Sequence, residues 1–228
     1  MRLRPIYAAI AATLVSAPLV SAATFLDSQN DNFDGNSNMD IAVVDVSNTA
    51  STITFTVTTR GSLASPSDWG KYCIGIDTGA GTGDFGNANV GNPWGRNIIM
   101  ASGMDAWVGS WVDSGGGAQA WKYSAGVWSQ GASATPTLTS TSTTFTLPLA
   151  DFGLSVGQTI LFDVYSTGGN GGDSANDASS NPLQSTSGWG GPYVTPAGTG
   201  HSYSILVPEP TTIAGLATVG LLALRRRK

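Results

Sequence analysis

The stretch Thr52-Ile53-Thr54-Phe55-Thr56-Val57-Thr58 alternates threonine with Ile, Phe and Val over seven residues. A period of two places the apolar side chains on one face of a β-strand and the threonines on the other. We therefore predict a half-buried strand over residues 52–58, with its apolar face turned toward a hydrophobic core.

Further strand-like runs lie on both sides of this one, separated by stretches rich in Gly, Asn, Asp and Pro. They cover Asp40–Val46, Tyr72–Asp77, Asn97–Ala101, Ala106–Val112, Ala118–Tyr123, Thr143–Leu149, Thr159–Tyr165 and His201–Leu206. No convincing helical period appears between residues 24 and 206. The pattern predicts an all-β fold, an antiparallel β-sandwich of eight to ten strands that forms one domain over residues 24–206.

The N-terminal end has the layout of a secretory signal peptide. Arg2 and Arg4 precede the apolar stretch Ile6–Val20, and the small residues Ser21, Ala22 and Ala23 follow. This pattern predicts a signal peptide over residues 1–23, export through the Sec translocon, and cleavage near Ala22 or Ala23. The folded domain is then expected to begin near residue 24.

The C-terminal end, residues 207–228, has three parts in order. Pro208, Glu209 and Pro210 are followed by an apolar run and then by the basic residues Arg225, Arg226, Arg227 and Lys228. The 14 residues 211–224 would span about 21 Å as a helix, against a hydrocarbon core of about 30 Å. We expect transient insertion into the inner membrane with the basic end in the cytoplasm. A simple tail anchor and a buried C-terminal helix are the alternatives.

This combination of motif, apolar segment and basic end resembles a PEP-CTERM sorting signal, the tag that exosortase enzymes recognise. The resemblance implies a Gram-negative bacterium that makes exopolysaccharide, with an exosortase as partner and cleavage near Pro208-Glu209-Pro210. It also implies that the protein passes through the inner membrane and is delivered to the cell surface or the biofilm matrix.

The composition of residues 24–206 argues against a nucleic-acid partner and rules out an intramolecular disulfide. Fourteen Asp and no Glu stand against four basic residues, a net charge of −10. Nucleic acid is therefore not expected as a partner, because phosphate binding requires basic patches. Cys73 is the only cysteine, so no intramolecular disulfide can form. It lies in a strand-like run, and we interpret it as a packing residue rather than a reactive thiol.

A second resemblance involves the body of the chain. The runs Phe145–Leu154 and Gly157–Val164 read as strand, Pro-led turn and strand, and they are similar to DOMON-like and family-nine-type carbohydrate-binding sandwiches. Residues 27–40, and the run Ile74–Gly79 with Gly81, Gly83 and Asp84, resemble the same group. The resemblance implies a jelly-roll-like sandwich that binds a sugar or a small ligand without catalysis.

The tryptophans are the candidate sugar-binding residues, because sugar C–H faces stack on aromatic rings while polar side chains at the rim bind hydroxyls. Trp69, Trp94 and Trp189 each lie between glycine and polar loop residues. Trp94 and Trp189 are the first candidates, and Trp69 is a further one. Trp107 and Trp111 share one strand face, where they form either a stacking surface or part of the core.

The long segment Gly168–Thr199 contains Trp189 and is interpreted as either a functional loop or a surface excursion. Calcium is the candidate cofactor, because Asp27, Asp31, Asp34 and Asn36 bring four oxygen-bearing side chains within ten residues. The stretch lacks the closing Glu of an EF-hand. The segment Asp173–Asp177 is a second, weaker calcium candidate, and in both places turn-forming Asp and Asn remain the alternative.

Catalysis is not expected. His201 is the only histidine, and no pair of carboxylates is placed by the sequence as a glycosidase requires. The sequence therefore predicts an exported, non-catalytic module that binds glycan or exopolysaccharide. A structural or adhesive matrix protein without sugar binding is the alternative, followed by a surface glycoside hydrolase with two close Asp.

Overall fold

The computed structural model describes residues 21–63, 69–79, 92–183 and 186–206. These residues form fourteen β-strands and two short 3-10 helices, Asp113–Gly115 and Leu149–Phe152, without an α-helix. No helix in this part of the chain is long and apolar enough to cross a membrane. Three sets of predicted residues lie outside the described part of the chain: residues 1–20 of the signal peptide expected over 1–23, the processing residues Pro208, Glu209 and Pro210, and the basic residues Arg225–Arg227.

The first sheet has five antiparallel strands. In spatial order they are β1 (Ser21–Leu26), β2 (Ile41–Asn48), β3 (Thr52–Thr59), β10 (Ser142–Pro148) and β9 (Thr137–Leu138). Strand β3 confirms the predicted alternation, because its Ile, Phe and Val side chains are buried. On its opposite face Thr54 and Thr56 form hydrogen bonds of 2.7 and 2.8 Å with Thr146 and Thr144 of β10.

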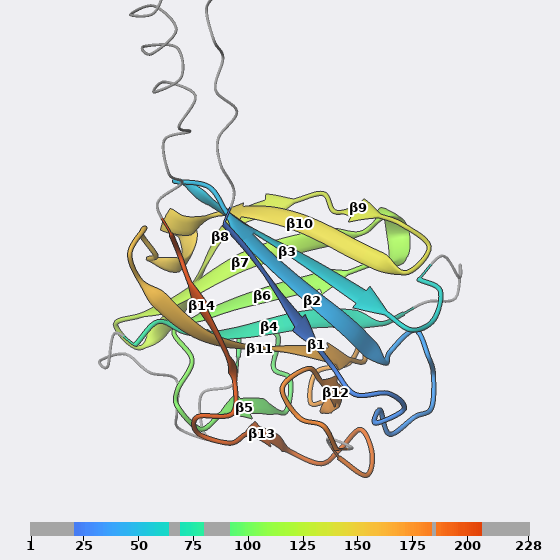
Figure 1. The fold of residues 1–228 in the computed structure, drawn as a ribbon. Helices are drawn as coiled ribbons and strands as arrows, with labels where there is room; N and C mark the ends of the chain where they lie inside the picture. Colours follow the sequence, from blue (N-terminus) through green and yellow to red (C-terminus); the bar gives the residue numbers. More distant parts are fainter. Residues whose placement is uncertain (1–20, 64–68, 80–91, 184–185, 207–228) are drawn as a thin grey trace, which may run out of the picture. The chain divides into compact units, whose positions relative to one another are not determined.

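The second sheet has seven antiparallel strands. In order they are β12 (Ala175–Ala178), β11 (Thr159–Thr167), β4 (Lys71–Asp77), β6 (Ala106–Trp111), β7 (Gly117–Ser124) and β8 (Val127–Ala134), and β14 (His201–Ser204) also pairs with β11. The two sheets pack face to face across the main core (Figure 1). At its centre the Phe55 and Phe162 rings, one from each sheet, lie 5.8 Å apart.

The second sheet is also covered on its other face. Two short strands, β5 (Ile98–Met100) and β13 (Tyr193–Thr195), pair in parallel and lie side by side in Figure 1. Together with the loops around them and around β12 they form what we call the cover. Nine buried residues fill a second core between the cover and the sheet: Cys73, Ile98, Met100, Met104, Trp107, Tyr165, Ala175, Ala178 and Tyr193.

Cys73 is fully buried in this second core, which confirms its interpretation as a packing residue. Burial raises the pKa of its thiol to about 12. The thiolate, which is the reactive form, is therefore not populated at neutral pH.

The nine predicted strands are all present, with shifted ends. Five strands were not predicted, namely β1, β8, β9, β12 and β13, so fourteen strands replace the expected eight to ten. Strand β1 was missed because residues 21–23 were assigned to the signal-cleavage region, and Ala22 and Ala23 in fact pair with Ser47 and Val46 of β2. The Gly168–Thr199 segment, expected to be one long loop, contains β12 and β13.

One buried carboxylate ties the cover to the second sheet. Asp163 of β11 is fully buried and accepts hydrogen bonds from Ser179, Ser180 and Thr195 of the cover, the last at 2.7 Å. Burial raises its pKa to about 6, while these hydrogen bonds act in the opposite direction. The Tyr165 hydroxyl is hydrogen-bonded to the same Thr195.

Glycines in β6 and β7 let two tryptophan rings approach the sheet closely. A Cβ atom at Gly109 would overlap the ring of Trp94, and one at Gly117 would overlap the ring of Trp111. The two rings lie 6.0 Å apart, and the Arg96 guanidinium carbon is 5.6 Å from the centre of the Trp94 ring. Glycine is therefore required at both positions for close approach rather than for a special backbone angle.

We predict that Asp163→Ala lowers the free energy of unfolding by at least ~2 kcal/mol, because several buried donors lose their acceptor. Chemical denaturation followed by tryptophan fluorescence measures the change. Asp45→Ala, at an exposed position of β2, is the control and should cost less than about 1 kcal/mol. Equal effects of the two variants would show that Asp163 does not hold the cover in place.

We predict that Gly109→Ala destabilises the protein by about 1–3 kcal/mol, because the added methyl group displaces the Trp94 ring from the sheet. Gly171→Ala is the matched control, since a Cβ atom there meets nothing within 4 Å. Thermal unfolding compares the two. A neutral Gly109→Ala variant would contradict the close Trp94–sheet packing.

Candidate functional site

An open hollow lined by two tryptophans lies between three segments that are distant in sequence. Its walls are Trp69, Gly169, Asn170, Asp173 and Trp189, and its volume is about 320 Å³. Trp69 is 45 % exposed, an unusual degree for so large a ring. Its ring lies 5.3 Å from that of Trp189, edge to face at 62°.

The polar wall of the hollow is a tight turn that follows β11. The Asp173 carboxylate accepts a hydrogen bond of 2.8 Å from the Asn170 amide, and Arg96 donates to the Asn170 carbonyl. A Cβ atom at Gly168 would overlap the Asp173 carboxylate and approach the Trp189 ring to 3.2 Å. The turn therefore brings an amide and a carboxylate close to the aromatic pair only because residue 168 is glycine.

Trp189 is held from two sides. Its carbonyl accepts a hydrogen bond of 2.8 Å from the amide of Ser174, the residue before β12. The Phe33 ring packs against it edge to face, with the ring centres 4.7 Å apart. The aromatic surface is thus built on an anchored side chain, as binding to a rigid ligand requires.

Only two of the five predicted sugar-binding tryptophans lie together in the hollow. Trp69 and Trp189 meet in the hollow. Trp107 is fully buried and stacks on Tyr165, so it has no face to offer a ligand. Trp94 and Trp111 pack against the second sheet at Gly109 and Gly117, and they are not among the residues that line the hollow. Asn170 was missed as a candidate, and Asp173 was considered only for calcium.

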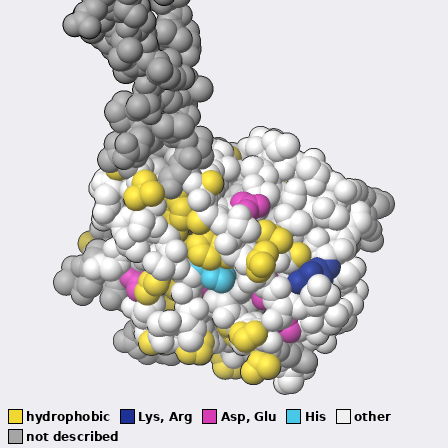
Figure 2. All heavy atoms as spheres, viewed as in Figure 1, with side chains coloured by type: hydrophobic (Ala, Val, Ile, Leu, Met, Phe, Trp, Pro, Cys, Tyr) yellow, Lys and Arg dark blue, Asp and Glu magenta, His cyan; other side chains and the backbone are white. Residues whose placement is uncertain are grey.

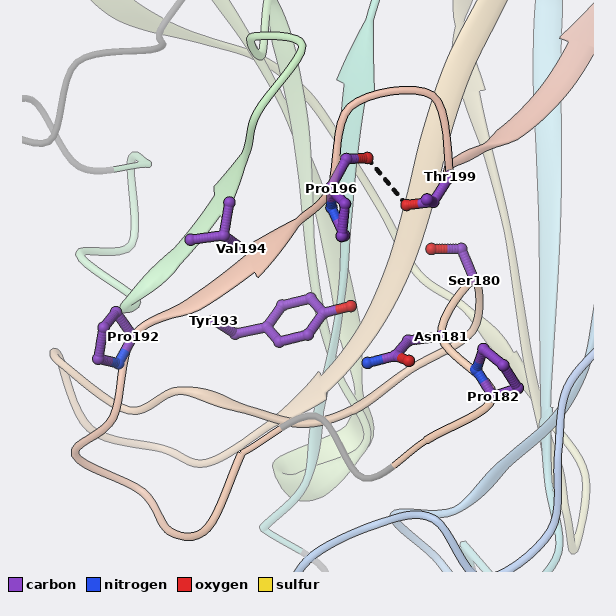
Figure 3. A pocket seen from close by; sticks show the side chains of 8 residues that line it. All are labelled: Ser180, Asn181, Pro182, Pro192, Tyr193, Val194, Pro196 and Thr199. Atoms are coloured by element: carbon purple, nitrogen blue, oxygen red, sulfur yellow. Dashed lines mark hydrogen bonds between the residues drawn. The ribbon is translucent and has the colours of Figure 1, made fainter.

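A second hollow of about 350 Å³ lies on the cover (Figure 3). Its walls are Ser180, Asn181, Pro182, Pro192, Tyr193, Val194, Pro196 and Thr199. Figure 3 shows the Tyr193 hydroxyl directed toward Asn181. Tyr193 is only 4 % exposed, so its ring cannot stack on a sugar as Trp69 can. This hollow is the weaker candidate.

The four predicted calcium residues belong to two separate groups in the structure. Asp27 and Asp31 come together with Asp177 of β12, and one carboxylate oxygen from each lies within 4.8 Å of the other two. Asp34 and Asn36 instead form a separate hydrogen-bonded network with Asn32 and Asn176. Sequence reasoning assigned Asp177 to the second calcium candidate, Asp173–Asp177, because 146 residues separate it from Asp31.

Burial, together with neighbouring carboxylates, raises the pKa of each of these three residues. Burial, followed by the charges of Asp177 and Asp31, raises the pKa of Asp27 to about 9. Burial raises the pKa of Asp177 to about 7, and it also raises that of Asp31, where Asp40 adds a like charge. Arg60 lowers the pKa of Asp31, but its guanidinium is paired with Asp40 at 3.3 Å.

His201 does not form a nucleophilic triad with its neighbours. Its Nε2 lies 3.0 Å from the Ser179 hydroxyl, and that hydroxyl also lies 3.2 Å from Asp163. In a triad the histidine stands between the serine and the acid, whereas here the serine stands between the other two and is itself buried. Absence of catalysis stays a prediction.

Charged side chains are sparse on the face that Figure 2 shows, where uncharged atoms predominate. Of the basic residues, Arg60 pairs with Asp40, and Lys71 pairs with Asp113 at 2.7 Å. The exclusion of a nucleic-acid partner is not tested by this and stays a prediction.

Comparison with known proteins finds no relative. No family model, no curated protein and no solved structure matches this chain. The features of the molecule that indicate a function are therefore the hollow and the acidic cluster.

Proposed function

We propose that the described domain is a non-catalytic glycan-binding module whose site is the Trp69–Trp189 hollow. The observation that carries the proposal is an exposed tryptophan ring fixed beside a second one, with an amide and a carboxylate in the same wall. Sugars have apolar C–H faces and a rim of hydroxyls, and this wall offers a partner for each.

The shape of the hollow favours a chain over a free small molecule. It is open and only about 320 Å³ in volume, at the low end for sites that enclose a ligand. A polysaccharide segment can rest on such a surface while its ends continue into solvent. The two-sheet architecture agrees with the jelly-roll-like carbohydrate-binding fold that the sequence resemblance implies, and we include that fold in the proposal.

The location is part of the same proposal. The two ends of the sequence are expected to direct export and exosortase sorting, which would bring the module to the cell surface or matrix, where exopolysaccharide is the abundant ligand. A structural or adhesive role without sugar binding is the competing function, and a surface glycoside hydrolase is a further one.

We predict that the full-length chain binds exopolysaccharide of the producing organism, or one member of a glycan panel, and that Trp69→Ala and Trp189→Ala each weaken binding about tenfold or more. Loss of a stacked aromatic ring removes about 1.5–3 kcal/mol of binding free energy, and about 1.4 kcal/mol corresponds to a tenfold change in the dissociation constant. Titration calorimetry and affinity electrophoresis measure the change.

Trp128→Ala is the matched control, because this tryptophan packs on Tyr123 outside the hollow. It should bind as the unmodified chain does, and Trp69→Phe should keep most of the affinity. Binding that survives both alanine variants would overturn the site. No binding to any glycan would overturn the module and favour the structural or adhesive role, and release of reducing ends would favour the hydrolase.

A further inference from the structure

The acidic cluster of Asp27, Asp31 and Asp177 has the geometry of a cation site. Asp27 and Asp31 come from the loop that follows β1 and Asp177 comes from β12, and one carboxylate oxygen of each lies within 4.8 Å of the other two. Oxygens bound to one calcium ion at ~2.3–2.6 Å can lie at most about 5 Å apart. One ion can therefore reach all three carboxylates without rearrangement of the backbone.

Several carboxylate oxygens of the cluster accept no hydrogen bond, and a metal cation would give them a partner. Asp31 is only 6 % exposed, and neither of its carboxylate oxygens accepts a hydrogen bond from another residue. Asp27 Oδ2 is likewise buried without a partner. Buried polar atoms are rarely left without a hydrogen-bond partner, and a role in binding an ion or a ligand is a recognised reason for it.

The charge around the cluster is also unbalanced. Asp40 stands close enough to raise the pKa of Asp31 and Asp177, so four carboxylates share this region. Arg60 pairs with Asp40, and its Nη2 donates to the carbonyls of Asp27 and Ser28. A proton can neutralise only one carboxylate, whereas one metal ion can be bound by all three carboxylates at once.

We propose that Asp27, Asp31 and Asp177 bind one calcium ion, which fixes the loop after β1 against β12. The three ligands offer oxygen only, and this favours a hard cation over zinc or copper. Magnesium is disfavoured, because it demands a near-octahedral arrangement and keeps several waters rather than entering a largely buried group of carboxylates.

The site has a structural link to the hollow. The loop that carries Asp31 also carries Phe33, whose amide donates to the Asn176 carbonyl and whose ring packs on Trp189. Calcium therefore acts as a positioning element for the Trp189 side chain. The metal site itself does not depend on the glycan proposal, since its ligands are not part of the hollow.

The test uses the full-length chain, stripped of metal with a chelator and titrated with calcium chloride. We expect saturable binding by calorimetry, and a rise of about 5–10 °C in the unfolding midpoint at a hundredfold excess over the dissociation constant. Asp31→Asn should weaken binding at least tenfold and lose the thermal shift. Without calcium, Asp31→Asn should be at least as stable as the unmodified chain, because a like charge is removed.

Asp27→Asn is the second ligand variant, to be used if Asp31→Asn does not fold, and the same pattern is expected of it. Asp45→Asn, at the exposed position on β2, should respond to calcium as the unmodified chain does. Absence of heat and of a thermal shift at millimolar calcium would overturn the proposal, as would an equal response to magnesium. Glycan binding is measured separately, so its failure leaves the calcium result standing.

Discussion

The central strands of the seven-stranded sheet, β4 and β11, have to be buried on both faces, and the rest of the structure follows from this constraint. Strands β4 and β11 are buried along almost their whole length, and their inward side chains pack against the five-stranded sheet. The outer face of an antiparallel sheet is commonly exposed to water, and where it is covered, helices usually cover it. The described chain has no α-helix, so two long irregular segments, joined by the β5–β13 pair, cover it instead.

A cover made of loops requires polar anchors, because its backbone groups cannot all be paired by regular structure. Asp163 supplies one anchor from the sheet side, and Asp177 supplies another by accepting the Ile41 amide at 2.7 Å. Both candidate sites adjoin this cover. Loops that are fixed this firmly can hold an exposed tryptophan or a group of carboxylates in one arrangement, which binding requires and a free loop cannot provide.

The predictability of the fold varies with how each strand is buried. Strands with one clearly apolar face, such as β3 and β10, were predicted within one residue of their ends. Strand β8 was missed because it is an edge strand with little burial on either side, so no apolar period marks it. Strand β12 was missed because its four residues include Asn176 and Asp177, which are buried through hydrogen bonds rather than through apolar character.

The sequence by itself determined the all-β class, the strands with alternating faces, the scarcity of basic residues and the impossibility of an intramolecular disulfide. These are properties of short stretches or of the overall composition, so they can be recognised without knowing which residues meet in space. Only the tertiary structure decided that Trp69 and Trp189 share a hollow, that Trp107 is core, and that Asp177 joins Asp27 and Asp31. The members of each group lie up to 150 residues apart, and their meeting depends on how the two sheets and the cover pack, which no local period encodes.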